Sequence, residues 1–297
     1  MATTPEFEMF ELYGGKVQIK FFTNSHQYWI SIKGTPFKRK GGATTFIGIK
    51  DKSKALMSWK GSRIVDFLLK RLAEGKITEE LICVASYIDE VEKEEATDIG
   101  KEIHAWCEQY IRFSLKQHGY EMPAMPEKKA IQTGVNAFLD WEKEHKVKFL
   151  STERVVYSMK NDYMGTMDIE AKVDGGLCLI DLKSSNGLYN SVNMQTAAYL
   201  KADEEESGRK YKGRWVIRLS KLDEVEYIEK EEQKRKTKKV IAKYKGVAYK
   251  EYPIAPYQAF EAKKLETDLE EDYEAFLACM TLYKWDAKTD YFKNIDK

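Results

Sequence analysis

The sequence lacks paired cysteines. Its four cysteines lie far apart, at Cys83, Cys107, Cys178 and Cys279, and no two of them form a Cys-x-x-Cys pair. This spacing argues against a zinc knuckle or a dithiol redox site. Because free cysteine is among the residue types most often buried, we expect four reduced thiols in the interior of a cytoplasmic protein.

An excess of charge of one sign and a long apolar run are also missing. Lys and Arg number 49 against 48 Asp and Glu, so the net charge is +1 and any basic surface for nucleic acid must be local. No apolar run approaches the ~20 residues that span a bilayer, and the first residues show no basic segment followed by an apolar one. We therefore expect a soluble cytoplasmic protein with no membrane partner.

The chain does have enough apolar residues for a large core, since 43% of its 297 residues are hydrophobic. Neither an internal repeat nor a low-complexity linker divides it. We expect one domain over 1–297, with an N-terminal β and helical elaboration (1–95), a core (96–220), and a β excursion with a C-terminal helix (221–297).

The pattern of apolar residues predicts the order of the elements. Two strands are expected around a turn within 16–33. Helices are expected at 53–73, within 78–94, and at 98–117, 128–145, 188–202 and 256–284. Strands are expected at 152–159, 165–173, 177–183 and 213–220, and an antiparallel β hairpin over 224–252. This order indicates the α/β class with a mixed sheet.

The most informative stretch joins Gly165-Thr-Met-Asp168 to Ile180-Asp181-Leu-Lys183 through Asp174-Gly175-Gly176, which is a hairpin signal. A turn at Gly175-Gly176 would set Asp168 opposite Lys183, and a turn at Asp174-Gly175 would set it opposite Asp181. Either turn places Asp168, Asp181 and Lys183 on one face. The apolar residues of the two strands then share the other face, which supports the register.

Two carboxylates on one face suit Mg²⁺ or Mn²⁺, which bind oxygen ligands and retain waters. The backbone carbonyl of Leu182 is a further candidate ligand. Beside such a metal, Lys183 could orient or deprotonate an attacking water, or neutralise charge on a phosphate. The alternative is a solvated ion pair of Asp181 with Lys183.

Two pairs of residues four apart on expected helices add further candidates. His104 and Glu108 would lie on one side of their helix, where they could reach a metal held on the sheet, with the alternative of a structural or surface histidine. Gln195 and Tyr199 follow the lysine strand and could face substrate in the same way.

Taken in order, Gly100-Lys-Glu-Ile-His104, Glu153, Gly165-Thr-Met-Asp168, Ile180-Asp181-Leu-Lys183 and Gln195-Thr-Ala-Ala-Tyr199 resemble the RecB-like branch of the PD-(D/E)XK nucleases. In the N-terminal part, His26-Gln-Tyr28, Thr44-Thr-Phe-Ile-Gly48 and Lys54-Ala-Leu-Met-Ser-Trp59 resemble phage exonucleases related to the mitochondrial genome maintenance exonuclease. The resemblance spans roughly 26–220 and is motif-specific between 100 and 200.

The resemblance implies a restriction-endonuclease-like core of αβββαβ order, with helical N-terminal and β-hairpin elaborations. It gives His104, Asp168 and Asp181 a metal-binding role and makes Lys183 the catalytic lysine. Glu153 and Gln195 become supporting positions of the active site, and Tyr199 a position near DNA. Two departures are visible: many relatives have Gly-Thr before the helix histidine where this chain has Gly100-Lys101, and the four-cysteine iron–sulfur set of some relatives is absent.

The expected function is hydrolysis of DNA from single-stranded ends or flaps, in phage-type recombination or replication and with proteins of those processes as partners. The location would be the host cytoplasm if a phage encodes the chain. A structure-specific or sequence-specific endonuclease and a catalytically idle DNA-binding module are the alternatives. The basic run that includes Lys234, Arg235 and Lys236, with the aromatic residues Tyr211, Trp215 and Tyr244, is a candidate track for a DNA strand, or else a solvated hairpin tip.

Overall fold

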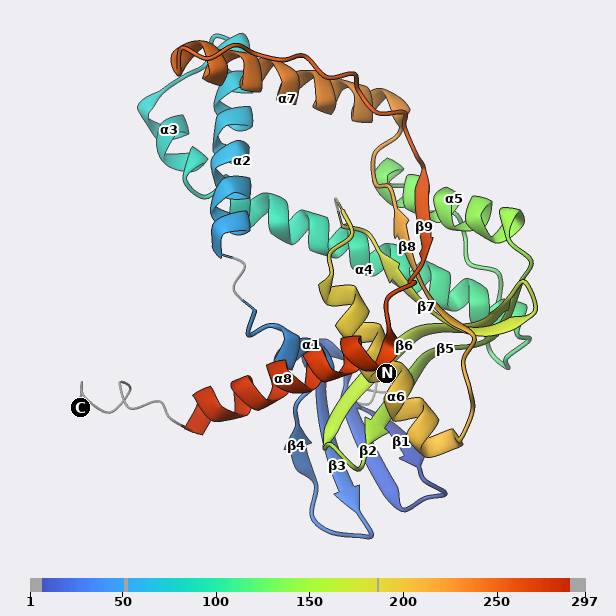
Figure 1. The fold of residues 1–297 in the computed structure, drawn as a ribbon. Coiled ribbons are helices and arrows are strands. Elements are labelled where there is room, and N and C mark those ends of the chain that lie inside the picture. The colour runs from blue at the N-terminus through green and yellow to red at the C-terminus, as the bar shows by residue number, and fades with distance from the viewer. Residues whose placement is uncertain (1–6, 51–52, 186, 289–297) are drawn as a thin grey trace, which may run out of the picture.

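A computed structural model of the protein describes residues 7–50, 53–185 and 187–288 and has a mixed α/β fold with two sheets (Figure 1). The smaller sheet is antiparallel, in the order β1-β2-β3-β4. Its strands are β1 (Glu8–Leu12), β2 (Val17–Phe22), β3 (Gln27–Ile32) and β4 (Lys38–Lys40). The two strands expected within 16–33 are confirmed as β2 and β3, with a single 3-10 turn at Thr23–Ser25 between them.

The larger sheet has the order β5-β6-β7-β8-β9. Its strands are β5 (Val147–Ser158), β6 (Tyr163–Val173), β7 (Gly176–Lys183), β8 (Gly213–Leu219) and β9 (Phe260–Lys264). Strand β8 runs parallel to β7, and the other neighbours are antiparallel. Helix α6 (Ser191–Ser207) connects the parallel pair, as a crossover between parallel strands requires. The expected mixed sheet is confirmed.

Helices cover both faces of the larger sheet. On one face α4 (Ile88–Ser114) and α5 (Lys129–Glu144) enclose a core with Trp141 and Phe138 at its centre. On the other, α6, α8 (Leu269–Lys288) and the short α1 (Ala43–Ile47) pack around Tyr163 and Phe276. The smaller sheet packs its own apolar face against the ends of β5 and β6, through residues such as Tyr157 and Met164. One continuous layered body results.

Three further helices form an arch above the sheet (Figure 1). Helices α2 (Ser53–Ala73) and α3 (Glu79–Ala85) rise on one side, and α7 (Glu224–Tyr244) runs across the top. At the foot of α7, Lys129 of α5 pairs with Asp223 at 2.6 Å. Lys230 of α7 lies close enough to Arg63 of α2 and Glu92 of α4 for their charges to affect its pKa.

Two expected elements are wrong. The β hairpin expected over 224–252 is helix α7, because Asp223 and Glu226 form a capping box and the segment is rich in Glu, Lys and Gln, which favour helix. The helix expected from 256 begins only at Leu269, since Phe260–Lys264 pairs with β8 as an edge strand. Helix α4 also begins earlier than expected, at Ile88.

The cysteines are distributed over four elements. Cys107 of α4 and Cys178 of β7 are buried as expected, Cys279 of α8 is partly buried, and Cys83 of α3 is exposed, which corrects the prediction for that residue. None of the helices in the described part of the chain combines the length and the apolar character needed to cross a bilayer.

Candidate active site

Strand β7 brings Asp181 and Lys183 to the same side of the sheet. Ile180 and Leu182 alternate with them and enter the core beneath α4 and α5. The Lys183 ammonium lies 2.6 Å from Oδ2 of Asp181. Both oxygens of Asp181 are buried, and apart from this ion pair neither has a hydrogen-bond partner among the described residues. A buried carboxylate with unused acceptor positions is costly unless something else binds it.

The hairpin register sets Asp168 beside Asp181. Val173 pairs with Gly176 and Ile169 with Ile180, so the turn is Asp174-Gly175 and the next position along places Asp168 opposite Asp181. This confirms the second of the two expected registers. Oδ2 of Asp168 accepts a hydrogen bond of 2.8 Å from the backbone N–H of Leu182. Because N–H and C=O of one strand residue point the same way, the Leu182 carbonyl lies on this edge too.

Strand β6 rotates at Asp168. Met167 belongs to the core beneath α6, whereas Ile169, two residues further, belongs to the core beneath α4. A regular strand would turn both to the same face. The neighbouring strand is irregular at the same level, where Glu153 has a left-handed φ of 48°. The rotation therefore lies at the level of Asp168 and Glu153, beside Asp181 of β7.

Burial dominates the electrostatics of this cluster. It raises the pKa of Asp181 to about 6, with Lys183 acting against the shift and Asp168 adding to it. Burial also raises the pKa of Asp168. For Lys183 burial acts the other way, but the two aspartates outweigh it and the pKa of the ammonium is raised. The site thus holds one firmly protonated lysine between two carboxyl groups that resist ionisation.

Glu153 extends the cluster. Burial, followed by the charges of Asp168 and Glu108, raises the pKa of Glu153 to about 9. At neutral pH it is therefore a protonated carboxylic acid. Its position beside Asp168 agrees with a supporting role, although no sequence signal fixes that role apart from the resemblance.

Helix α4 presents His104 to the same cluster. The helix approaches closely because Gly100 faces Ser184, just beyond β7, where a Cβ atom would lie 2.5 Å from the serine Oγ. Burial and the charge of Lys183 lower the pKa of His104 to about 4, against the opposing effect of Asp181. The imidazole is therefore neutral at pH 7, which is the form that binds metals. Glu108 instead pairs with Arg112 at 2.7 Å.

Helix α6 closes the opposite side of the site. The Gln195 amide donates to the Tyr199 hydroxyl at 3.2 Å, as their spacing of four suggests. The ring of Tyr199 is buried over Gly165, where a Cβ atom would lie 2.3 Å from the ring. Asp168 and Asp181 are near enough to raise the pKa of the Tyr199 hydroxyl, after burial. Contact of Tyr199 with DNA stays a prediction, although the residue is buried in the structure.

Sequence reasoning missed Tyr28 as a site residue. This tyrosine comes from β3 of the smaller sheet, and its hydroxyl lies 2.8 Å from Oγ1 of Thr166. Burial raises its pKa to about 12, and the charges of Glu153 and Asp168 add to the shift. The only available signal was its place in the His26-Gln-Tyr28 motif, because nothing local indicates that β3 reaches the larger sheet here.

The basic run lies on α7 and not at a hairpin tip. Lys234 forms an ion pair with Glu231, and Arg235 forms one with Glu251. Lys236 is exposed, as is Tyr244 at the end of the helix. The other two aromatic residues of the expected track lie elsewhere: Tyr211 donates to Asp203, and Trp215 packs on His145. A continuous track of these aromatic residues is therefore wrong.

The donor set suits a hard divalent cation. Asp181 lies near Asp168 and the neutral imidazole of His104, and the Leu182 carbonyl lies on the same edge. Mg²⁺ usually takes only one or two carboxylates and completes its shell with water and substrate oxygens. Within the described ranges, no three His, Cys, Asp or Glu side chains form a group arranged to hold a metal ion.

No protein-family profile and no curated protein matches this chain.

Proposed function

We propose that this chain is a metal-dependent deoxyribonuclease of the PD-(D/E)XK type that hydrolyses phosphodiester bonds in DNA. The observation that carries the proposal is the buried carboxylate of Asp181, which lies beside the carboxylate of Asp168 and has the Lys183 ammonium as its only ionic partner among the described residues. A structural ion pair would leave no reason for a second carboxylate that resists ionisation at the same place. A cation held by the two carboxylates would give that reason.

In this proposal each residue has a distinct task. Asp168, Asp181 and the neutral His104 hold the cation, with the Leu182 carbonyl as a further ligand. When bound, Mg²⁺ or Mn²⁺ polarises the phosphate and lowers the pKa of a water. Lys183 remains protonated between the aspartates, so it stabilises negative charge on the phosphate. Its raised pKa makes deprotonation of the water by Lys183 the less favoured of the two roles considered.

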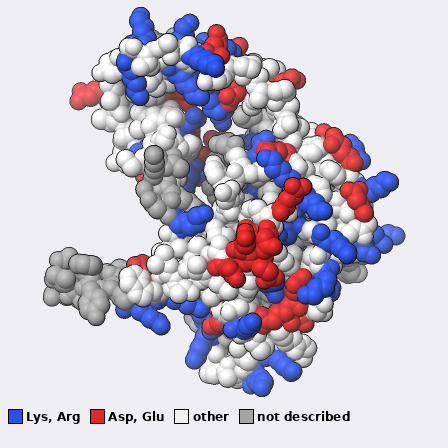
Figure 2. Space-filling view, in the orientation of Figure 1, with Lys and Arg blue, Asp and Glu red and all other residues white. Residues whose placement is uncertain are grey.

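The shape of the molecule supports a single-stranded end as substrate. Figure 2 shows a hollow between the arch of α2, α3 and α7 and the rest of the molecule, with Lys and Arg side chains over the arch. A strand that enters beneath an arch must enter by an end or pass as a flexible single strand. We therefore propose an exonuclease or flap nuclease that serves DNA recombination or replication.

The test is cleavage of oligonucleotides labelled at the 5′ or the 3′ end. We expect cleavage with Mg²⁺ or Mn²⁺ and none with EDTA. Asp181→Asn should lower the rate at least ~100-fold, because it removes a charged metal ligand, while Asp174→Asn in the exposed hairpin turn should not. Cleavage that continues in excess EDTA would disprove the proposal.

Two further substrates separate the alternatives. Cleavage of covalently closed single-stranded circles would replace the exonuclease by an endonuclease of the same site. Salt-sensitive binding of DNA without cleavage under any divalent metal would identify an idle binding module.

A further inference from the structure

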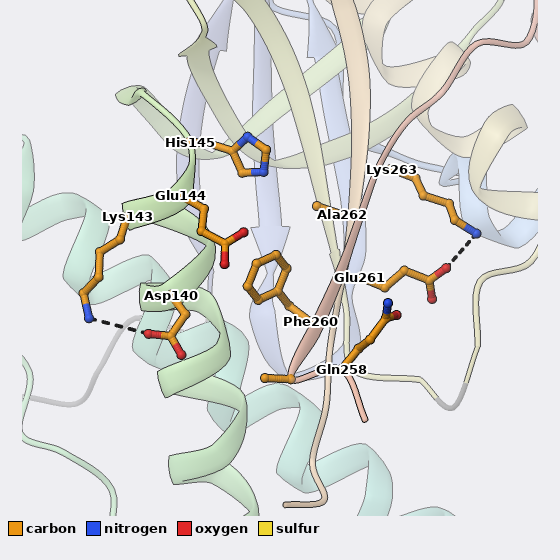
Figure 3. Close-up of a pocket in the computed structure, with 10 residues that line it drawn as sticks. Asp140, Lys143, Glu144, His145, Gln258, Phe260, Glu261, Ala262 and Lys263 are labelled. Atoms are coloured by element: carbon orange, nitrogen blue, oxygen red, sulfur yellow. Dashed lines mark ion pairs between the residues drawn. The ribbon is translucent and has the colours of Figure 1, made fainter. Parts of the chain in front are cut away.

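Strand β9 leaves a free edge on the larger sheet, two strands away from β7. It is the last strand in the order, and its other side faces an open groove of about 820 Å³ between its residues and the C-terminal end of α5 (Figure 3). In every second residue of β9, the backbone N–H and C=O point toward β8. The Ser220 N–H donates to the Ala259 carbonyl and the Leu265 N–H donates to the Arg214 carbonyl, and these two bonds fix which residues point toward β8. The groups of Phe260, Ala262 and Lys264 therefore point out of the sheet.

These outward groups have no hydrogen-bond partner within the described part of the chain. A row of such groups is a template for another strand. The residues between them carry opposite charges: Glu261 pairs with Arg218 at 3.1 Å, and Lys263 lies 2.6 Å from Glu261. Figure 3 shows Glu261 and Lys263 side by side, joined by this ion pair. The edge thus presents one acid and one base at positions two apart.

We infer that β9 pairs with β9 of a second copy of this chain, antiparallel and centred on Ala262. This register sets Glu261 opposite Lys263 of the other copy twice, and Phe260 opposite Lys264. Shifting the centre to Glu261 would oppose two glutamates, and shifting it to Lys263 would oppose two lysines, both of which are destabilising. Among these three registers, the charge pattern favours the one centred on Ala262.

The hydrogen-bond pattern agrees with that register. The pairs that exchange two hydrogen bonds are Phe260 with Lys264 of the other copy and Ala262 with Ala262. These are the residues whose backbone N–H and C=O groups point away from β8. Glu261 and Lys263 fall at the closely spaced positions, where side chains approach most nearly. A five-residue edge is short, so we expect a weak dimer that forms at roughly 10 µM or above.

Disulfide trapping tests the register. In a Cys83→Ser background, which removes the exposed thiol, Ala262→Cys should form a covalent dimer on mild oxidation. Opposed residues in a hydrogen-bonded pair have Cα atoms ~5.5 Å apart, within the range that a disulfide spans. Arg39→Cys, on the exposed edge strand β4 of the other sheet, is the matched control and should give little dimer.

Charge exchange tests the pairing. Sedimentation velocity should show that Glu261→Lys and Lys263→Glu each weaken dimerisation at least ~10-fold, because each opposes like charges. The double variant E261K/K263E should recover the dimer. Circular dichroism checks the fold, since Glu261→Lys also removes the contact with Arg218. The inference is overturned if the parent protein stays monomeric at ~100 µM. It is also overturned if Ala262→Cys forms no more covalent dimer than the Arg39→Cys control, even if another partner pairs with this edge.

Discussion

At the scale of single residues, the proposed site favours the protonated form of acidic side chains that would be ionised in water. Asp181, Asp168 and Glu153 all have raised pKa values, chiefly because burial penalises their charged forms. Such a cluster lowers the stability of the protein, and in the proposed nuclease a bound cation would offset this cost. It also links folding to pH in a direction opposite to that of an ordinary surface carboxylate.

Glu153→Gln should reveal this linkage. With a folded pKa of about 9 against an ordinary value of 4.5, the folded protein holds a proton that the unfolded chain loses as pH rises between these values. The free energy of unfolding of the parent should therefore fall across this window, by up to several kcal/mol. The glutamine variant should show a smaller fall, because only Asp181 and Asp168 then keep raised pKa values. Urea unfolding at pH 5, 7 and 9 measures it, with Glu102→Gln, exposed on α4, as control. Parallel pH profiles of parent and Glu153→Gln would refute the buried acid.

His104→Ala tests the imidazole as a ligand. Since burial keeps His104 neutral, its loss removes a lone pair without removing a charge. We expect Mn²⁺ affinity, measured by calorimetry, to fall at least ~10-fold while the fold is retained. His118→Ala, in an exposed loop, should bind Mn²⁺ as the parent does. Equal affinity in the two variants would assign His104 a purely structural role.

Much of the arrangement of the candidate site could be predicted from the sequence, because it depends on signals between residues close together in the chain. Alternation along β7 and the hairpin signal at Asp174-Gly175 bring Asp181, Lys183 and Asp168 together, as the register has it. The rotation of β6 and the position of Tyr28 beside Thr166 could not be predicted. Both depend on packing between elements distant in the sequence, and the left-handed φ of Glu153 carries no residue preference that would signal it.

At the scale of elements, close approach of helices to the sheet depends on residues without side chains. Because Gly165 has no side chain, the ring of Tyr199 can pack directly against it. In the same way, Gly100 lets α4 approach Ser184 at the end of β7. These contacts set how far the helices lie from strands β6 and β7. The distances between His104 or Gln195 and the aspartates follow from them.

Gly165→Ala should therefore both destabilise the protein and reduce its activity. The added methyl group would meet the Tyr199 ring at 2.3 Å, in a buried place with little freedom to adjust. We expect a loss of about 1–3 kcal/mol, typical of overpacking. Gly61→Ala is the opposite case, because Gly61 lies in α2 with open space around it and alanine favours helix. Thermal unfolding should show Gly61→Ala unchanged or stabilised. A Gly165→Ala protein as stable as the parent would contradict the close packing.

Helix α7 shows why one element was mispredicted. A run of lysines between two turn-like segments resembles a hairpin tip in composition. The deciding signal was the Asp223 cap with Glu226 three residues later, followed by acids and bases at helical spacing such as Glu231 and Lys234. Helix capping is a stronger guide than a charge run where the two disagree.

At the scale of the whole molecule, the protein is almost neutral, but the arch carries a local basic surface. Net charge is +1, yet Lys and Arg gather over α2 and α7 in Figure 2. Lys236, Lys238 and Lys239 are exposed on α7, and no ion pair joins them to the described residues. These three lysines are free to meet phosphates.

Reversing these three charges (K236E/K238E/K239E) should weaken binding of single-stranded DNA and reduce its salt dependence. Each lost phosphate contact lowers the slope of log K against log salt by ~0.7. The matched control K16E/K33E/K38E makes the same net change on the smaller sheet, away from the arch, and should bind as the parent does. Fluorescence anisotropy at several salt concentrations measures both. Equal losses in the two variants would mean that net charge, and not the arch, attracts DNA.

The attachment of α7 has a consequence for motion. In this helix of 21 residues only Ala242 is buried, and surface ion pairs such as Lys129 with Asp223 hold its foot. Few apolar contacts mean a low free energy of local opening, so α7 belongs to the least protected part of the molecule in hydrogen exchange, while the strands of the larger sheet belong to the most protected. The arch can therefore open and reclose many times in the lifetime of one folded molecule. In the proposed nuclease, such opening would admit and release a strand without disturbing the larger sheet.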